Sequence, residues 1–473
     1  MVKRVIIIGA GEAGRMVVRE ILANPDAGYQ VVGYLDDDTA LHGQTLETRP
    51  VLGACDRLID LVPEKDVKEA IIAVPTGSRE FVRRVITLCR DAGISFKIVP
   101  GMIEIIEGPV RLEQIRDVRP EDLLGRETVE FDEEDLRRGL GGRRIMVTGA
   151  GGSIGGELCR QIGRFGLEEL QLLGRGENQI FDIEHQLRLA NPELNVRAVI
   201  ADIREGKALT RMLGELRPHY VYHTAAHKHV HYMEAYPEEA IKNNVFGTVN
   251  LIRAAVETGV ERVVMISTDK AVNPRGVMGA SKRIAEFLMT DWSRELDRPR
   301  LLTVRFGNVL GSRGSVVPLF INQIRAGGPV TVSDPRATRF FMSLKEACLL
   351  VVQASMMGDG GEIFVLRMGT PLKIIEVAKD LIALHGLRPE LDLKIKIVGL
   401  RPGEKLHEAL TVDGEVVTDS VHDYILAAHP QLPEGWHRER VLGRLEELTR
   451  DGDGQGIRDY LSELIPDARL GDG

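Results

Sequence analysis

Short apolar runs alternate with helical patterns along the chain, at the spacing of a strand–helix–strand fold. The first run, Val5–Ile8, is continuously apolar, as in a strand buried on both faces of a parallel sheet. A helical pattern covers residues 15–22, and further apolar runs follow at residues 31–35, 70–74 and 96–99. This regular alternation predicts a doubly wound α/β unit at the start of the chain.

The same pattern restarts after residue 140. The run Arg143–Val147 leads into a glycine-rich segment and a helix that continues to Ile162. Later runs predict more strands, with helical patterns between them, at residues 170–173, 196–201, 219–223, 262–267 and 301–305. The chain is therefore predicted to contain two Rossmann-like, doubly wound units, each with a parallel sheet.

At 473 residues the chain is too long for one ordinary core. We place the boundary in a charged, irregular stretch that ends in Gly139, Gly141 and Gly142. The predicted divisions are an N-terminal nucleotide-binding unit at residues 1–124, a linker at 125–140, a catalytic unit at 141–425 whose substrate lobe starts near residue 305, and a C-terminal tail at 426–473. The tail contains a charged, helix-like stretch that indicates no function by itself.

Composition argues against several classes of partner. The net charge of −9 disfavours nucleic acid and an anionic membrane. The four cysteines lie far apart in the sequence, which is typical of reduced thiols in the cytoplasm and not of a disulfide framework or a zinc site. No apolar run reaches the roughly 20 residues that span a bilayer, so we expect a cytoplasmic protein without a transmembrane segment.

The first glycine-rich segment has the full spacing of a dinucleotide fingerprint. Gly9, Gly11 and Gly14 follow the first strand and open a helix, and Asp36 ends the second strand. Glycines let a backbone approach a pyrophosphate, the helix N-terminus faces it, and the acid can hold a ribose. Two interpretations stay open: a nucleotide site at these four residues, or a nucleotide-free unit used for assembly. Catalysis is not expected there, because the unit shows no acid–base constellation.

The second glycine-rich segment precedes the residues with catalytic potential. Gly149, Gly152 and Gly155, with Ser153 and Ile154, are predicted to hold a dinucleotide cofactor. In an open parallel sheet, ligands bind beyond the carboxyl ends of the strands. The residues at or just after those ends are Arg175, Glu177, Asp202, Ile203, Ala225, Ala226, Lys228, His229, Thr268, Asp269 and Lys270, with Met278 and Lys282 downstream. An Asp-Lys pair is usually a solvated surface feature, but its place at a strand end favours a function.

At these residues the chain resembles the extended short-chain dehydrogenase/reductases, and among them the CapD-like polysaccharide-biosynthesis dehydratases. The resembling segments are Thr148–Gly155, Ala225–Val230, Asn243–Thr248, Ser267–Lys282, Arg305–Pro318, Thr338–Met342 and Arg401–Glu408. They cover most of residues 141–425, and the combination is highly specific. The resemblance extends to the first unit and the linker through Gly9–Gly14, Tyr34–Asp38 and Asp122–Arg126.

The resemblance implies a 4,6-dehydratase that acts on UDP-N-acetylglucosamine. Such an enzyme passes the C4 hydride to a tightly bound NAD or NADP, loses water across C5 and C6, and returns the hydride to C6. By resemblance Asp269 is the acid for the C6 hydroxyl, Lys270 is the C5 base, and Thr268 hydrogen-bonds near O4. Lys270 can serve as a base if desolvation and a cationic nicotinamide lower its pKa.

Position 278 departs from the wider superfamily, which has Tyr in a Tyr-x-x-x-Lys pair. Met278 cannot carry a proton, although Lys282 is present. One interpretation is an inactive, cofactor-sensing protein. The other is a Met-bearing branch of the dehydratases, in which Lys282 or a water held by Thr268 opens the proton route from O4. The intact Thr268, Asp269, Lys270 and Lys282 favour the second.

Cofactor and substrate contacts follow from the same resemblance. Gly174 stands where many relatives have a ribose-binding Asp, and Arg175 beside it tolerates a 2′-phosphate, so NADP remains an option; Glu177 is the other candidate for the ribose. The remaining assigned residues are Lys228, Asn243 and Lys282 for the cofactor, and Lys228, His229, Asn308, Arg313, Arg339, Arg401 and Glu404 for the UDP-sugar. Relatives self-associate, so a homo-oligomer is expected.

Alternatives to this hypothesis remain. The histidines His223, His227, His229 and His231 suggest a metal cluster, but the chemistry needs no metal, and we predict none. A UDP-sugar 4-epimerase would share the fold and the hydride step. It would not need the Asp-Lys pair and would rely on the missing Tyr. A non-catalytic NAD(P)H-sensing protein is the alternative outside enzymes.

Overall fold

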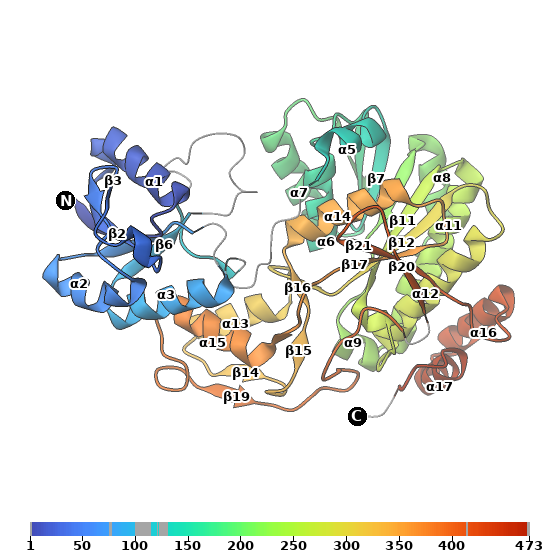
Figure 1. The fold of residues 1–473 in the computed structure, drawn as a ribbon. Helices are drawn as coiled ribbons and strands as arrows, with labels where there is room; N and C mark the ends of the chain where they lie inside the picture. Colours follow the sequence, from blue (N-terminus) through green and yellow to red (C-terminus); the bar gives the residue numbers. More distant parts are fainter. Residues whose placement is uncertain are drawn as a thin grey trace. The chain divides into compact units, whose positions relative to one another are not determined.

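The computed structural model describes residues 2–74, 78–99, 115–120, 122, 131–412 and 415–470. The chain forms two compact units, coloured along the sequence in Figure 1. The first comprises residues 1–128, 316–332 and 375–396, and the second contains the rest. Two segments of the predicted substrate lobe, 316–332 and 375–396, thus group with the N-terminal unit.

The first unit is built on a parallel sheet. Within the described residues its main strands have the order β2-β1-β5-β6, and each neighbouring pair is parallel. Its strands are β1 (Lys3–Ile8), β2 (Tyr29–Leu35), β3 (Thr45–Leu46), β4 (Arg49–Pro50), β5 (Glu69–Ile72), β6 (Ser95–Ile98), β14 (Val330–Val332) and β19 (Ile395–Ile397), and its helices are α1 (Glu12–Ala23), α2 (Leu58–Glu64), α3 (Arg79–Asp91), α13 (Val316–Arg325) and α15 (Ile374–Leu384). Arg83 on α3 donates a hydrogen bond to Asp380 on α15, which ties a later segment to this unit.

The second unit contains a larger sheet. In the described part of the chain its strand order is β20-β21-β17-β12-β11-β10-β7-β8-β9, and the strands from β17 to β9 are mutually parallel. Its strands are β7 (Arg144–Thr148), β8 (Glu169–Gly174), β9 (Val196–Ile200), β10 (Tyr220–His223), β11 (Arg262–Thr268), β12 (Arg300–Phe306), β13 (Asn308–Val309), β15 (Thr338–Arg339), β16 (Phe341–Met342), β17 (Ile363–Leu366), β18 (Leu372–Lys373), β20 (Val416–Asp419) and β21 (Ile425–His429). The direction of strand order reverses between β7 and β10, which is where ligands of such sheets bind.

Helices cover both faces of this sheet (Figure 1). They are α5 (Glu133–Leu140), α6 (Ser153–Ile162), α7 (Glu177–Ala190), α8 (Gly206–Leu216), α9 (Val230–Ala235), α10 (Pro237–Ala240), the π-helix Ile241–Phe246, α11 (Gly247–Thr258), α12 (Val277–Ser293), α14 (Leu344–Met357), α16 (Arg438–Asp451) and α17 (Gly454–Leu464). One hydrophobic core joins the strands to α5, α6, α7 and α14, and the other joins them to α8, α11, α12, α16 and α17. The predicted α/β class with two parallel-sheet units is confirmed.

Two boundaries differ from the prediction. Residues 125–130 of the predicted linker lie outside the described part, but residues 133–140 form helix α5. Asp132 caps it by accepting hydrogen bonds from the backbone of Glu134 and Asp135, and Leu136 and Leu140 are fully buried in the core. The tail is no appendage either: β21 joins the sheet and α16 and α17 pack in the core, because the apolar side chains of these helices recur on one face.

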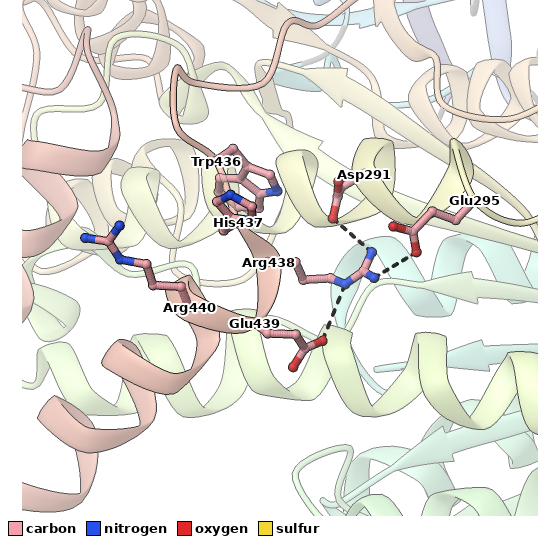
Figure 2. A pocket seen from close by; sticks show the side chains of 7 residues that line it. All are labelled: Asp291, Glu295, Trp436, His437, Arg438, Glu439 and Arg440. Carbon is pink, nitrogen blue, oxygen red and sulfur yellow. Dashed lines mark hydrogen bonds and ion pairs between the residues drawn. The ribbon is translucent and has the colours of Figure 1, made fainter.

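The start of α16 is attached to the end of α12 by charges and aromatic rings. Arg438 donates hydrogen bonds to Asp291 at 2.9 Å and Glu295 at 2.8 Å, and its guanidinium lies 4.6 Å from the centre of the Trp292 ring. Figure 2 shows Asp291, Glu295 and Arg438 at a pocket, with Trp436 beside them. The cavity there has a volume of about 330 Å³. The cavity lies at the end of α12 and not at the carboxyl ends of the parallel strands. It therefore marks the attachment of the C-terminal helices.

We predict that Arg438→Ala destabilises the second unit, because Asp291 and Glu295 would lose their shared cation. The expected loss is about 1–3 kcal/mol. The chain has two tryptophans, Trp292 and Trp436, so denaturant unfolding followed by tryptophan fluorescence reports on this site. Arg440→Ala is the matched control, since Arg440 is exposed and forms no ion pair with a described residue. Equal stability of the two variants would contradict the prediction.

Candidate active site

In the glycine loop after β7, backbone segments lie so close together that a side chain at the glycines would collide with them. Gly149 has φ +67°, and a Cβ there would lie 2.8 Å from the amide nitrogen of Ala225. A Cβ at Gly155 would lie 2.3 Å from the carbonyl oxygen of Gly149. Gly152 caps α6, whose first residues are Ser153 and Ile154. These residues leave a bare backbone surface at a helix N-terminus, which fits a dinucleotide pyrophosphate.

The residues predicted to distinguish NAD from NADP lie at the ends of β8 and β9. A Cβ at Gly174 would lie 2.9 Å from the Ile180 side chain, which leaves little room for an acid there. Arg175 is half exposed, and its Nη1 lies 3.9 Å from Oδ2 of Asp202. Asp202 accepts a 2.8 Å hydrogen bond from Arg204; burial would raise the pKa of Asp202, but this bonding outweighs it and the pKa is lowered. Ile203 is buried beside it, and exposed Glu177 opens α7.

A buried histidine fixes the end of β10. His223 lies 2.8 Å from the hydroxyl of Thr148 and 3.1 Å from that of Thr248. Burial, together with the charge of Lys282, lowers the pKa of His223 to about 3, so its ring is neutral. The described residues contain no group of three or more His, Cys, Asp and Glu side chains that could hold a metal ion. His223 thus has a structural role in this strand.

The loop after β10 is tied to the π-helix and to α12. Asn244 accepts a hydrogen bond from the backbone of His227 at 2.8 Å and donates one to Ser281 at 3.0 Å. Asn243, predicted to contact the cofactor, is buried and donates to Asn244 at 3.1 Å. The widened turn of a π-helix commonly occurs at functional sites. This loop contains Ala225 and Ala226, which lie beside the glycine loop through Ala225.

The end of β11 places the predicted acid in a dry environment. Asp269 is fully buried, and its Oδ1 accepts hydrogen bonds from Thr268 at 2.9 Å and from Lys270 at 3.0 Å. Its other oxygen, Oδ2, has no hydrogen-bond partner among the described residues. Burial raises the pKa of Asp269 and the charge of Glu408 raises it further, against the opposing charge of Lys270. A carboxyl group in this setting is suited to donate a proton.

Lys270 is held as an ammonium. Its Nζ lies 3.0 Å from Asp269, 3.1 Å from Oδ1 of Asn308 and 3.5 Å from Glu408. Burial would lower the pKa of Lys270, but the two carboxylates outweigh burial and raise it. The surrounding residues therefore do not supply the lowering of the Lys270 pKa that its role as a base requires, and a lowering by a bound cationic nicotinamide stays a prediction. Asn308 contacts Lys270 of this pair, and its predicted contact with the UDP-sugar stays a prediction.

Helix α12 carries the other predicted catalytic residues. Met278 and Lys282 are both buried, with 3% and 5% of their surfaces exposed. Burial lowers the pKa of Lys282 to about 8, although the charge of Glu286 one turn further on raises it. At physiological pH most of Lys282 is therefore still protonated, but an appreciable fraction is the neutral amine. Such a group can exchange a proton with a hydroxyl, which the thioether of Met278 cannot.

The segment 401–408 is fastened beside this pair by Arg339. Arg339 donates to the carbonyl oxygens of Thr338, Leu406 and Lys405 and to Oε1 of Glu404, at 2.7–3.1 Å. Its side chain is only 7% exposed. These contacts give Arg339 a structural role, and its contact with the UDP-sugar stays a prediction. Glu404 also accepts from Ser333 and from the backbone of Arg401, whose side chain is exposed.

Arg313 contacts the glycine loop after β7, and its predicted contact with the UDP-sugar stays a prediction. Its side chain donates to the carbonyl oxygen of Gly151, and its backbone amide donates to Ser153 at 3.0 Å. Lys228 donates to the carbonyl oxygen of Arg313 at 2.7 Å. A Cβ at Gly314 would touch the His229 ring at 2.7 Å. The structure thus brings Lys228, His229 and Arg313 together, next to the loop predicted to hold the cofactor.

Glu408 and Gly307 are site residues that the sequence did not indicate by themselves. The side chain of Glu408 is 2% exposed and contacts Lys270. A Cβ at Gly307 would lie 3.1 Å from Oδ2 of Asp269, so glycine leaves room for the carboxyl group. Both residues lie within segments that resemble the family, and this resemblance was the sequence signal that could have indicated them. Their roles depend on long-range contacts that no local pattern reveals.

The glycine loop of the first unit has comparable geometry. Gly9 has φ +103°, and a Cβ at Gly14 would lie 2.0 Å from the carbonyl oxygen of Gly9. Gly11 caps α1, and Asp36 accepts a 2.7 Å hydrogen bond from the backbone of Ala10. These residues come together as predicted. Both interpretations stay open, because this geometry serves a ribose-binding acid and a purely structural loop equally well.

Comparison with known proteins gives two family matches. Residues 145–430 match the family described as polysaccharide biosynthesis protein, and residues 2–100 match a family described as CoA-binding domain. The capsular polysaccharide biosynthesis protein CapD of Staphylococcus aureus is 43% identical over 425 residues, which cover 89% of this chain and 71% of that protein. A UDP-glucose 4-epimerase of Rickettsia rickettsii is 38% identical over 290 residues, 60% of this chain and 82% of that protein.

Among solved structures, Pen from Bacillus thuringiensis is similar to this chain. The two are 32% identical, with a TM-score of 0.57 over 62% of this chain and 89% of Pen. The CapD relative, by contrast, matches over 89% of this chain, so the likeness in sequence is not confined to one unit.

Proposed function

We propose that this chain, which belongs to the polysaccharide biosynthesis protein family, is a UDP-N-acetylglucosamine 4,6-dehydratase. Proteins of this family have the extended short-chain dehydrogenase/reductase fold and modify nucleotide sugars. The observation that carries the proposal is the buried Asp269–Lys270 pair at the end of β11. Elimination of water across C5 and C6 needs an acid for the leaving hydroxyl and a base for the C5 proton. Hydride transfer alone needs neither.

Asp269 is assigned as the acid. Hydroxide is a poor leaving group, so the C6–O bond breaks readily only when a proton reaches the oxygen. Burial keeps the pKa of Asp269 raised, and Gly307 leaves space at its Oδ2. A positioned general acid contributes roughly 10²–10⁴ in rate.

Lys270 is assigned as the base at C5. The C5–H bond breaks, its proton goes to the amine, and its electron pair forms the enolate with the C4 ketone. Lys270 must first lose its own proton, and Asp269 at 3.0 Å is the nearest described acceptor. The pair can therefore pass from an ion pair to a neutral acid and a neutral amine without changing its number of protons.

The 4-hydroxyl proton is assigned to Lys282, whose pKa of about 8 suits exchange at neutral pH. A bound oxidised nicotinamide dinucleotide would accept the C4 hydride and return it to C6, and its positive charge would favour neutral Lys270 only before the hydride is transferred. The glycine loop Gly149–Gly155 would hold its pyrophosphate. We assign Arg401 and Glu404 to the uridine diphosphate, and the first unit to a second nucleotide at Gly9–Gly14 and Asp36.

A UDP-sugar 4-epimerase is the second candidate. The Rickettsia relative is named as a UDP-glucose 4-epimerase, which favours it. A 4-epimerase reaction would not use the buried acid Asp269, and Met278 provides no hydroxyl that could carry a proton. These two observations support the dehydratase. A chain that binds the cofactor but turns over no UDP-sugar would instead be a sensor.

We predict that Asp269→Asn separates the two halves of the reaction. Elimination should fall by about 10²–10⁴, because the amide cannot donate the proton to the leaving hydroxyl. Oxidation at C4 should continue, so a bound 4-keto sugar accumulates and near-ultraviolet absorbance rises on mixing with UDP-N-acetylglucosamine. Asp182→Asn, at an exposed position on α7, is the control. Normal turnover of the Asp269 variant, or a folded variant that cannot oxidise the sugar, would refute the assignment.

Arg175 is predicted to recognise a 2′-phosphate. Arg175→Ala should then weaken NADP binding by about 1.5–3 kcal/mol, the size of a charge-assisted hydrogen bond, and leave NAD binding nearly unchanged. Dissociation constants from fluorescence titration test this directly. An equal loss for both cofactors, or none, would remove Arg175 from that role.

A further inference from the structure

A buried carboxylate outside the predicted catalytic set lies against the acid–base pair. The side chain of Glu408 is 2% exposed. Its Oε1 lies 3.5 Å from Nζ of Lys270 and 3.9 Å from Nε of Arg339, and its Oε2 lies 3.0 Å from Nζ of Lys405. A charge placed this deep would be costly without such partners. Glu408 is therefore held in a fixed position as an anion.

The charges nearest the pair come from carboxylates and from basic side chains. Lys270 faces Asp269, Glu408, the guanidinium of Arg339 and the ammonium of Lys228. Asp269 faces Lys270 and Glu408, and Lys405 donates to its backbone oxygen. Burial would raise the pKa of Glu408, but Lys270, Lys405 and Arg339 lower it to about 2. Glu408 thus stays ionised throughout the range in which the pair titrates.

We propose that Glu408 is a positioning residue of the acid–base pair, whose fixed negative charge keeps protons on Asp269 and Lys270 and so sets the pH range of elimination. This inference rests on the proposed dehydratase. The geometry carries it: Glu408 contacts the ammonium of Lys270, and that ammonium contacts Asp269. A buried negative charge at this distance disfavours loss of a proton from either group.

The direction of the effect follows from the sign of the charge. Glu408 raises the pKa of Asp269 and the pKa of Lys270. Without its charge both pKa values fall. Lys270 would then become neutral at lower pH, and Asp269 would lose its proton at lower pH. Both limbs of the pH profile of elimination should move in the acidic direction.

The test is Glu408→Gln in the full-length, cofactor-loaded enzyme, with UDP-N-acetylglucosamine as substrate. We expect both limbs of the elimination profile to shift to lower pH by about one unit, as for the loss of one close charge. Oxidation at C4, followed in single turnovers, should keep its profile, because it depends on Lys282. Glu408→Asp retains the charge and should restore the original profile. Glu404→Gln should change KM for the substrate and leave the profile in place.

Several outcomes would overturn the inference. An unshifted profile in folded Glu408→Gln would do so, and so would an equal shift in Glu408→Asp, which would indicate packing and not charge. If Glu408→Gln does not fold, infrared difference spectra of the wild-type enzyme against Glu408→Asp decide. An ionised carboxylate band of Glu408 is expected across the pH range of elimination, and a protonated carboxyl band of Glu408 in that range would reject its role. Failure of the wild type to form a dehydrated product would instead reject the proposed function.

Discussion

The carboxyl group of Asp269 is completely buried, and the surroundings of the catalytic unit are arranged around this charge. An isolated carboxylate in the protein interior is strongly disfavoured, so it must be neutralised or protonated. Lys270 and Thr268 bond one of its oxygens, and Gly307 leaves room beside the other. The same burial that makes an ionised Asp269 costly suits it to the proposed role of proton donor. Stability and chemistry here place opposite demands on one side chain.

A second cluster of buried charged side chains lies beside the end of strand β11. Glu286 on α12 accepts a 2.7 Å hydrogen bond from Ser267, the residue before Thr268, and pairs with the fully buried Arg305 at 2.9 Å. Arg305 also pairs with Glu415 at 2.8 Å. Because Glu286 lies one turn from Lys282, this cluster fixes the distance between the helix that carries Lys282 and the strand that carries Asp269. Asp269 and Lys282, the two residues proposed to transfer protons, are thereby positioned by the same cluster.

Sequence patterns predicted the elements of this site better than its contacts. Buried parallel strands are continuous apolar runs, and glycine loops have fixed spacing, so the strand ends and Gly149–Gly155 were predictable. The partners of Arg339 and Asn308 were not, because segments far apart in the chain supply them. The packing of the C-terminal helices was not predicted either, because a charged amphipathic stretch does not reveal that its apolar face packs on the core.

The account depends on one claim, that this chain removes water from a nucleotide sugar. The most direct measurement is incubation of the cofactor-loaded protein with UDP-N-acetylglucosamine in deuterium oxide, followed by NMR and mass spectrometry of the product. The account predicts loss of one water, a 4-ketone, a methyl group at C6, and deuterium from solvent at C5. A product epimerised at C4, with the mass of the substrate and no deuterium at C5, would contradict it.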